Sequence, residues 1–322
     1  MNSSAVLAGI GTCLPARVVT NAELERRLTT SDAWIHSRTG IRERRRLEPP
    51  FTVMDLAEAA GRNALGAYRV QVQAVVLATT TPLRPCPAGA PELATRLGLT
   101  GVAAYDISAV CSGALYGIAN AVGLIAGGLA DAVLVVCAED YSTIVDPDDR
   151  STAVIFGDGA GAIVLRRGDR TEPGAVLALD LGSDGNHADL ISRPAPAGPL
   201  QMDGPAVYRL ALEHFTATTR RVLKDVGWNA ADIDAYVPHQ ANQRIIDAVA
   251  AKLALAPGTA VSNIARLGNT AAASIPLALA EAVGTGRLTP GQRTVLASLG
   301  GGLTWGSAAL IWPEITAISS EL

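Results

Sequence analysis

The sequence has few aromatic and few charged residues for its length. Of 322 residues, 4% are aromatic and 17% are charged, whereas 49% are hydrophobic and 32 are glycines. This composition excludes a disordered or fibrous chain and is typical of a well-packed enzyme. With so few rings, the core must consist mainly of Ala, Val, Leu and Ile. The length allows two domains or one internally duplicated domain.

Three further absences exclude other classes of protein. The net charge is −4 and the pI is about 5.6, which argues against a nucleic-acid-binding protein. The four cysteines are scattered without a CxxC pair, so we expect no disulfide framework or zinc site, and a reducing, cytoplasmic location. The N-terminus lacks a basic region before its apolar run, and glycines interrupt the longest apolar stretch, 114–130. We therefore expect no signal peptide and no membrane span.

Short runs rich in Val, Ile, Leu and Ala alternate with longer helical segments. Such runs, with little polar alternation, are typical of strands covered on both faces. Strands are predicted at 6–10, 74–78, 132–137, 162–165, 176–181, 235–237, 294–298 and 307–311. Helices are predicted at 53–67, 111–126, 206–226, 243–252 and 271–285. The alternation predicts an α/β layered fold.

The two halves of the chain resemble each other weakly. FGDGAGAIVL (156–165) and GGLTWGSAALI (301–311) are both glycine-rich turns that lead into an apolar strand near the end of a half. This similarity suggests duplication, with halves at 1–170 and 171–322. The segment 182–205 is rich in Gly, Pro and Asp, including Pro194, Pro196 and Pro199, and we expect a loop over the surface or the active site.

Cys111 lies where a β-like run, 104–108, meets a long apolar helix. At that junction the sulfur would lie near free backbone N–H groups and the positive end of the helix dipole, which favour a thiolate. A thiolate can take an acyl group from a thioester. The alternative is a small buried hydrophobic residue, the usual role of an unpaired cysteine.

Three other positions have similar settings in the second half. His239, in VPHQAN, stands between a strand and a helix that begins near Asn242, and suits proton handling or a structural hydrogen bond. Asn269, in GNTAAAS, precedes a helix and could cap it or polarise a carbonyl group. The glycines 300–302 follow a strand and form either a tight turn or an oxyanion hole.

Taken together, the order Cys111, VPHQAN, GNTAAAS and SLGGGLTWGSA closely resembles the β-ketoacyl-acyl carrier protein synthase III family. The segments DAWIHSRTGIRERR and DPDDRSTAVIFGDGAGA extend the resemblance over nearly the whole chain. It implies a thiolase fold of two five-layered αβαβα halves, usually a homodimer. It also implies a cytoplasmic acyltransferase of fatty acid or polyketide biosynthesis, with priming of a secondary-metabolite pathway as one form, which needs no metal or bound cofactor.

The resemblance also implies roles for single residues. Cys111 would carry the acyl group from acyl-CoA. His239 and Asn269 would bind the thioester carbonyl of malonyl-acyl carrier protein, and the N–H groups of Cys111 and Gly301 would form the oxyanion hole. The CoA and its pantetheine arm would contact Trp34, Arg38, Arg150, Gly204, Tyr208 and Asn242.

Several arginines provide positive charge on an acidic protein. We expect Arg244 to dock the carrier protein, because it follows the catalytic histidine closely in the chain. The cluster at 42–46 contains four arginines and is either a docking site or an ordinary solvated surface. The glycines of FGDGAGA lack the Lys-Ser/Thr of a phosphate-binding loop, so we interpret them as close packing beside the active site.

One departure from the family pattern concerns the acyl pocket. Cys86 stands where well-known bacterial members carry a bulky aromatic residue that closes the pocket of the partner subunit. The smaller side chain predicts a roomier pocket than acetyl requires. Two other functions stay open. One is acyl transfer to a carrier protein or hydroxyl group without condensation, and the other is a non-catalytic partner subunit, although such subunits typically lose the cysteine.

Overall fold

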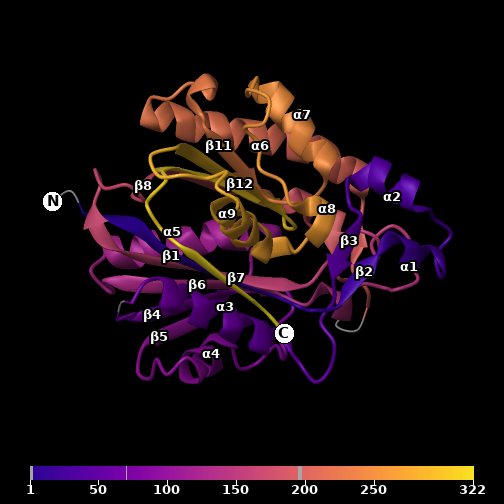
Figure 1. Ribbon diagram of the computed structural model, residues 1–322, viewed down its shortest axis with the longest axis horizontal. Helices are drawn as coiled ribbons and strands as arrows, with labels where there is room; N and C mark the ends of the chain where they lie inside the picture. The colour runs from indigo at the N-terminus through magenta and orange to yellow at the C-terminus, as the bar shows by residue number, and fades with distance from the viewer. Residues whose placement is uncertain (1–2, 70, 195–197) are drawn as a thin grey trace.

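Two β-sheets alternate with three layers of helices (Figure 1). The computed structural model describes residues 3–69, 71–194 and 198–322, and Pro196 lies outside these ranges. The first sheet has the order β14-β1-β7-β6-β4-β5. Its strands are β1 (Ser3–Leu14), β4 (Ala74–Ala78), β5 (Ala103–Ile107), β6 (Ala132–Glu139), β7 (Gly159–Asp169) and β14 (Ala317–Glu321). The second, β11-β12-β13-β8, consists of β8 (Val176–Ser183), β11 (Ala235–Pro238), β12 (Arg293–Gly300) and β13 (Thr304–Ile311).

The helices form an inner layer and two outer layers. Helices α5 (Gly113–Ala126) and α9 (Ser274–Gly284) lie between the sheets and share one hydrophobic core with both (Figure 1). Helices α3 (Val53–Ala67) and α4 (Ala90–Arg96) cover the first sheet, and α6 (Gly204–Val226) and α7 (Gln243–Leu253) cover the second. The predicted αβαβα layering is therefore confirmed.

The core is built from small aliphatic side chains, as the composition predicts. Every residue of β4 and β6 is buried, and both strands are rich in alanine and valine. Glycine allows the closest approach in the first half: a Cβ on Gly11 of β1 would lie 2.1 Å from the backbone nitrogen of Ala64 in α3. Among the described residues, no helix is both long enough and apolar enough to cross a lipid bilayer.

The two inner helices begin in the same unusual way. Each is preceded by a 3-10 turn, η1 (Val110–Ser112) before α5 and η5 (Ala271–Ala273) before α9. Val110 and Ala271 have positive φ angles of 48° and 44°, which side-chain-bearing residues rarely adopt and which often mark functional sites. The predicted helices 111–126 and 271–285 therefore each begin with a tight turn. The halves repeat this feature at the positions that carry Cys111 and follow Asn269.

Several short elements were not predicted. The strands β2 (Val18–Thr20) and β3 (Glu43–Arg45) and the helices α1 (Asn21–Glu25), α2 (Asp32–Thr39) and α8 (Ile264–Leu267) are too short for a clear periodicity. The segment 182–205, expected to be a loop over the surface or the active site, contains more regular structure than a loop. The described part contains the end of β8, the turn η3 (Gly185–Leu190) and a small sheet of β9 (Ile191–Ser192) and β10 (Gln201–Met202), and α6 begins there.

Candidate active site

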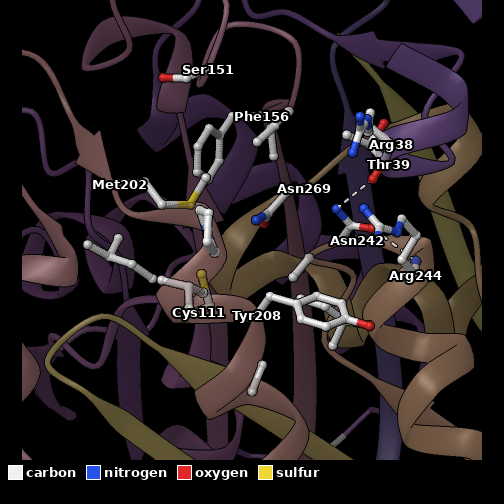
Figure 2. Close-up of a pocket in the computed structure, with 18 of the residues that line it drawn as sticks. Arg38, Thr39, Cys111, Ser151, Phe156, Met202, Tyr208, Asn242, Arg244 and Asn269 are labelled. Atoms are coloured by element: carbon white, nitrogen blue, oxygen red, sulfur yellow. Dashed lines mark hydrogen bonds between the residues drawn. The ribbon is translucent and has the colours of Figure 1, made fainter. Parts of the chain in front are cut away.

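One cavity of about 680 Å³ brings together most of the residues that the motifs singled out, although the oxyanion-hole candidate Gly301 is not among its lining residues. Cys111, His239 and Asn269 all line it, although each follows a different strand or loop. Figure 2 shows Cys111 beside Met202 and Phe156 in one part of the cavity, with Arg38, Asn242 and Arg244 in another. The other described residues that line the cavity include Trp34, Thr39, Tyr141, Arg150, Ile191, Gly204, Val207, Tyr208, Arg209, Phe215 and Leu299.

Cys111 lies in the turn η1, at the start of the central helix α5, and is 5% exposed. Hydrogen bonds to the second half fix this turn: the Ser112 hydroxyl donates to the Thr304 carbonyl, and the Thr304 hydroxyl donates to the Ala109 carbonyl, both at 3.0 Å. The nucleophile candidate is therefore held at the junction of the two sheets' inner faces.

The protonation of Cys111 is governed by opposing effects. Burial raises the pKa of the thiol, and the nearby Glu139 carboxylate raises it further, while the backbone N–H of Cys111 lowers it. The position at a helix start was expected to favour the thiolate. At this buried position the loss of solvation outweighs this help, because a thiolate loses more hydration than a thiol.

The glycines that follow β12 pack directly against the Cys111 turn. A Cβ on Gly300 would lie 2.8 Å from the Cys111 backbone nitrogen, so only glycine fits there. A Cβ on Gly301 would instead lie 2.9 Å from the carbonyl oxygen of Ile191 in β9. The Gly301 backbone therefore lies between the nucleophile turn and the small sheet β9–β10.

His239 follows the last residue of β11, and its backbone N–H donates to the Ala297 carbonyl of β12 at 2.8 Å. The side chain is buried, and Nδ1 lies 2.6 Å from the Ser274 Oγ. Burial lowers the pKa of His239 to about 3, because charging the ring would cost its hydration. The imidazole is therefore neutral at physiological pH, and Nε2 is the nitrogen free to act in the cavity.

Asn269 does not cap helix α9, whose N-cap is Ala273. Its Oδ1 accepts a hydrogen bond of 2.8 Å from the Ala271 N–H, which leaves the amide NH₂ group as a donor. The Asn269 N–H donates to the Ile155 carbonyl, and the Gly157 N–H donates to the Asn269 carbonyl. In Figure 2 the amide points towards the part of the cavity that holds Cys111. The FGDGAGA segment thus packs beside the site, as predicted.

The mouth of the cavity carries aromatic rings covered by arginines. The Arg150 guanidinium lies 4.8 Å from the centre of the Trp34 ring, and the Arg244 guanidinium 5.6 Å from that of Tyr208. Asn242 is the N-cap of α7: its Oδ1 accepts from the Arg244 N–H, and its Nδ2 donates to the Arg38 carbonyl (Figure 2). Gly204 leaves open space, since a Cβ there would meet no atom within 4 Å.

The mouth of the cavity is positively charged. Arg38, Arg150, Arg209 and Arg244 line the cavity, and none of them forms an ion pair with another described residue. No aspartate or glutamate is among the described residues that line the cavity. Arg209 was missed in the sequence because it lies inside a long helix, where an arginine is common.

The cluster 42–46 is mainly structural. Arg44 is buried, and its guanidinium donates to the Val19 and Val154 carbonyls and to Asn21 Oδ1. Arg45 pairs with Glu321 at 3.0 Å. Both guanidinium groups thus form interactions within the fold, which supports the structural interpretation for Arg44 and Arg45.

Two residues near the site had no clear signal in the sequence. Glu139 ends β6 and is buried, and it accepts hydrogen bonds from the Thr80 N–H and from the hydroxyls of Thr80 and Thr81. Burial raises the pKa of Glu139 to about 8. Ser274 was read only as part of the GNTAAAS motif. Cys86, by contrast, is exposed and does not line the cavity of its own chain.

Comparisons with known proteins agree on one family. Residues 105–185 match the family described as 3-oxoacyl-(acyl-carrier-protein) synthase III, and residues 223–312 match its C-terminal part. A relative from Streptomyces coelicolor, named β-ketoacyl-(acyl-carrier-protein) synthase III 2, is 54% identical over 96% of this chain and 94% of its own. A synthase III from Pseudomonas aeruginosa is 49% identical over 98% of both chains.

Solved structures show the same relationship. The crystal structure of 3-oxoacyl-(acyl carrier protein) synthase III from Pseudomonas aeruginosa superposes with a TM-score of 0.95 at 51% identity, over 97% of this chain and 99% of that one. A priming β-ketosynthase of a polyketide pathway gives a TM-score of 0.91 at 32% identity, over 96% of both chains. The chain therefore belongs to the β-ketoacyl-acyl carrier protein synthase III family, acyl-transferring condensing enzymes of the thiolase superfamily.

Proposed function

We propose that this protein carries out the family's acyl-CoA-primed condensation with malonyl-acyl carrier protein through an acyl thioester on Cys111. The observation that carries the proposal is the convergence of Cys111, His239 and Asn269 on one cavity with a cationic mouth. In the first step the Cys111 sulfur attacks the acyl-CoA carbonyl carbon, and CoA leaves as the thiol. The exchange replaces one thioester by another, so it needs no outside energy source.

In the second step, loss of CO₂ from the malonyl group leaves an electron pair as an enolate. The enolate carbon attacks the acyl carbonyl on Cys111, and the thiolate leaves as the β-ketoacyl product forms. His239 and the Asn269 amide can both donate to the thioester oxygen where negative charge develops. The backbone N–H groups of Cys111 and Gly301 would stabilise the oxyanion on the acyl group. Neither step requires a metal or resident cofactor.

The mouth suits a long anionic substrate. The guanidinium of Arg150 stacks on Trp34, and an adenine ring could enter between these two flat groups. Phosphates of CoA would meet Arg38 and Arg150, and the pantetheine arm would pass Gly204, Tyr208 and Asn242. Arg209 and Arg244, without carboxylate partners among the described residues, would meet the acidic carrier protein.

We further propose that the protein forms a homodimer, and that each chain consists of two duplicated halves, 1–170 and 171–322. Strand β5 is the edge of the first sheet, and Leu83, three residues before Cys86, is 52% exposed in the single chain. Strand β14 does not fit a simple division into two halves, because it belongs to the second half of the chain but pairs with β1 of the first. Sedimentation velocity would test the dimer. A cytoplasmic location stays a prediction from cysteine usage.

Acyl transfer without condensation is not favoured, because both donors for the enolate are present in the cavity. Intact-mass spectrometry with a panel of acyl-CoAs tests the proposal. Wild type and Cys86→Ala should gain one acyl group, and Cys111→Ala none. Asn269→Ala should still load but should lose about a hundredfold or more in malonyl decarboxylation. Condensation by Asn269→Ala near the wild-type rate would favour the simple acyltransferase instead.

A further inference from the structure

The position of one proton decides what His239 can do. A neutral imidazole carries a single N–H, on either Nδ1 or Nε2, and the other nitrogen offers a lone pair. The ring is 2% exposed and neutral at physiological pH. If Nε2 holds the proton, the ring donates into the cavity. If Nδ1 holds it, the ring presents a lone pair there and would repel a developing enolate oxygen.

Ser274 is the side chain that contacts the other ring nitrogen. It is the first residue of α9 and is 1% exposed, and its Oγ lies 2.6 Å from His239 Nδ1. The Gln240 backbone N–H points at the same oxygen, at 3.4 Å. Among the described residues, this hydroxyl forms no other hydrogen bond. It does not bond to the Thr270 carbonyl one turn earlier, although serines in helices often do so.

Counting donors and acceptors settles the direction of the short contact. A hydroxyl has one hydrogen to donate and can accept up to two. If the ring donated from Nδ1, the Ser274 oxygen would accept from both Nδ1 and Gln240, and its own hydrogen would be buried without an acceptor. Buried polar groups seldom lack a partner. If the hydroxyl donates to Nδ1, every group in the contact has a partner, and the ring proton lies on Nε2.

We propose that Ser274 is a positioning residue that holds His239 in the Nε2–H form, so that the ring donates a hydrogen bond to the malonyl thioester oxygen. This inference rests on the role proposed above for His239. The same loop also orients Asn269 as a donor, because the Ala271 N–H donates to its Oδ1 and leaves the NH₂ group free. One short segment, 269–274, thus orients both catalytic side chains as donors.

The proposal predicts that Ser274→Ala affects the two steps of the reaction differently. Loading of Cys111 from acyl-CoA does not require a donor at Nε2, so Ser274→Ala should load at the wild-type rate. Decarboxylation requires the donor, so kcat for malonyl-acyl carrier protein should fall about tenfold to hundredfold with little change in KM. Ser274→Thr, which keeps a hydroxyl, should retain most of the activity. Ser307→Ala removes another buried hydroxyl, from β13 away from the cavity, and should decarboxylate normally.

Nuclear magnetic resonance of protein labelled with ¹⁵N-histidine gives a readout that does not depend on activity. The His239 signals, assigned by their loss in His239→Ala, should show the Nε2–H form in wild type from pH 5 to pH 8. Ser274→Ala should show a mixture of the two forms. An Nδ1–H form in wild type would overturn the proposal even if Ser274→Ala failed to fold.

The activity data distinguish this inference from the proposed function. If His239→Ala itself decarboxylated normally, the role of His239 would be wrong. If His239→Ala were inactive but Ser274→Ala decarboxylated at the wild-type rate, the role of Ser274 alone would be wrong.

Discussion

At the scale of single residues, a buried carboxyl group opposes the thiolate form of Cys111. Glu139 lies close enough to raise the pKa of the Cys111 thiol when it is ionised. Burial raises the pKa of Glu139 itself to about 8, so the carboxyl is mostly protonated at pH 7 and charged at pH 9. The fold therefore keeps this side chain largely neutral near pH 7, where its charge would otherwise oppose a Cys111 thiolate.

Replacement of this carboxyl should change how Cys111 reacts at high pH. In Glu139→Gln the charge cannot form, so iodoacetamide should label Cys111 several times faster than in wild type at pH 9. At pH 6.5 the two rates should be similar, because the wild-type carboxyl is then protonated. Peptide mapping measures the rates, and equal rates at both pH values would show that Glu139 does not act on the thiol.

The burial of neutral His239 makes stability depend on pH. Its pKa is lowered to about 3 in the folded protein, against an ordinary value of 6.5. Below pH 6.5 the unfolded chain therefore binds a proton on His239, whereas the folded chain does not. The free energy of unfolding consequently decreases as the pH falls from 6.5 towards 3.

Comparison with His239→Gln isolates this effect from other titrating groups. Relative to the variant, the free energy of unfolding of wild type should fall by about 2 kcal/mol between pH 7 and pH 5. Urea denaturation at both pH values, at one protein concentration, provides the measurement. A difference that does not change with pH would mean that the ring is charged or solvated in the folded protein.

At the scale of elements, helix α7 ends in a backbone conformation that is strained for alanine and that glycine would relieve. Ala254 caps this helix in the left-handed region, with a φ of 55°, and its side chain is exposed. Glycine adopts this conformation without steric conflict and is the preferred residue at such positions. Ala254→Gly should therefore stabilise the protein by up to about 1 kcal/mol.

The same exchange inside the helix provides a matched control. Ala251 is also exposed but lies within α7, where glycine costs about 1 kcal/mol relative to alanine. Thermal unfolding should thus give a higher Tm for Ala254→Gly and a lower Tm for Ala251→Gly. Destabilisation by both variants would mean that Ala254 is not strained.

At the scale of the whole molecule, the proposed homodimer would make the accepted length of the acyl chain depend on a second subunit. Cys86 is exposed and away from the cavity of its own chain, so it can close an acyl pocket only in a partner. A small residue there should admit acyl groups longer or more branched than acetyl. Each buried methylene contributes about 0.8 kcal/mol, so two methylenes shift preference roughly tenfold.

A larger side chain at position 86 should narrow the range of acyl-CoAs that the protein accepts. Cys86→Phe should shift the preference from hexanoyl-CoA towards acetyl-CoA by about tenfold or more, measured by competition between the two. Cys137→Ala changes another cysteine, buried in β6, and should leave the preference unaltered. An unchanged preference in Cys86→Phe would place Cys86 outside the pocket.

The sequence by itself determined the layered fold and the three residues at its centre. Long segments such as α3 and α6 carry their own periodicity, and buried strands such as β4 and β6 are continuous apolar runs, so local patterns predict them. Cys111, His239 and Asn269 stand where a strand or turn meets a helix, and their motifs are long enough to be recognised.

Only the tertiary structure decided how these residues are tuned. The Nδ1 contact of His239 with Ser274 joins residues 35 positions apart, and the Glu139 carboxyl reaches hydroxyls 58 and 59 positions away. The four arginines of the mouth come from three helices and a loop. Hydrogen bonds and solvation depend on distances in space, and these distances cannot be predicted from a local sequence pattern. The residues of the candidate site could thus be predicted from the sequence, whereas their protonation states depend on contacts that only the fold creates.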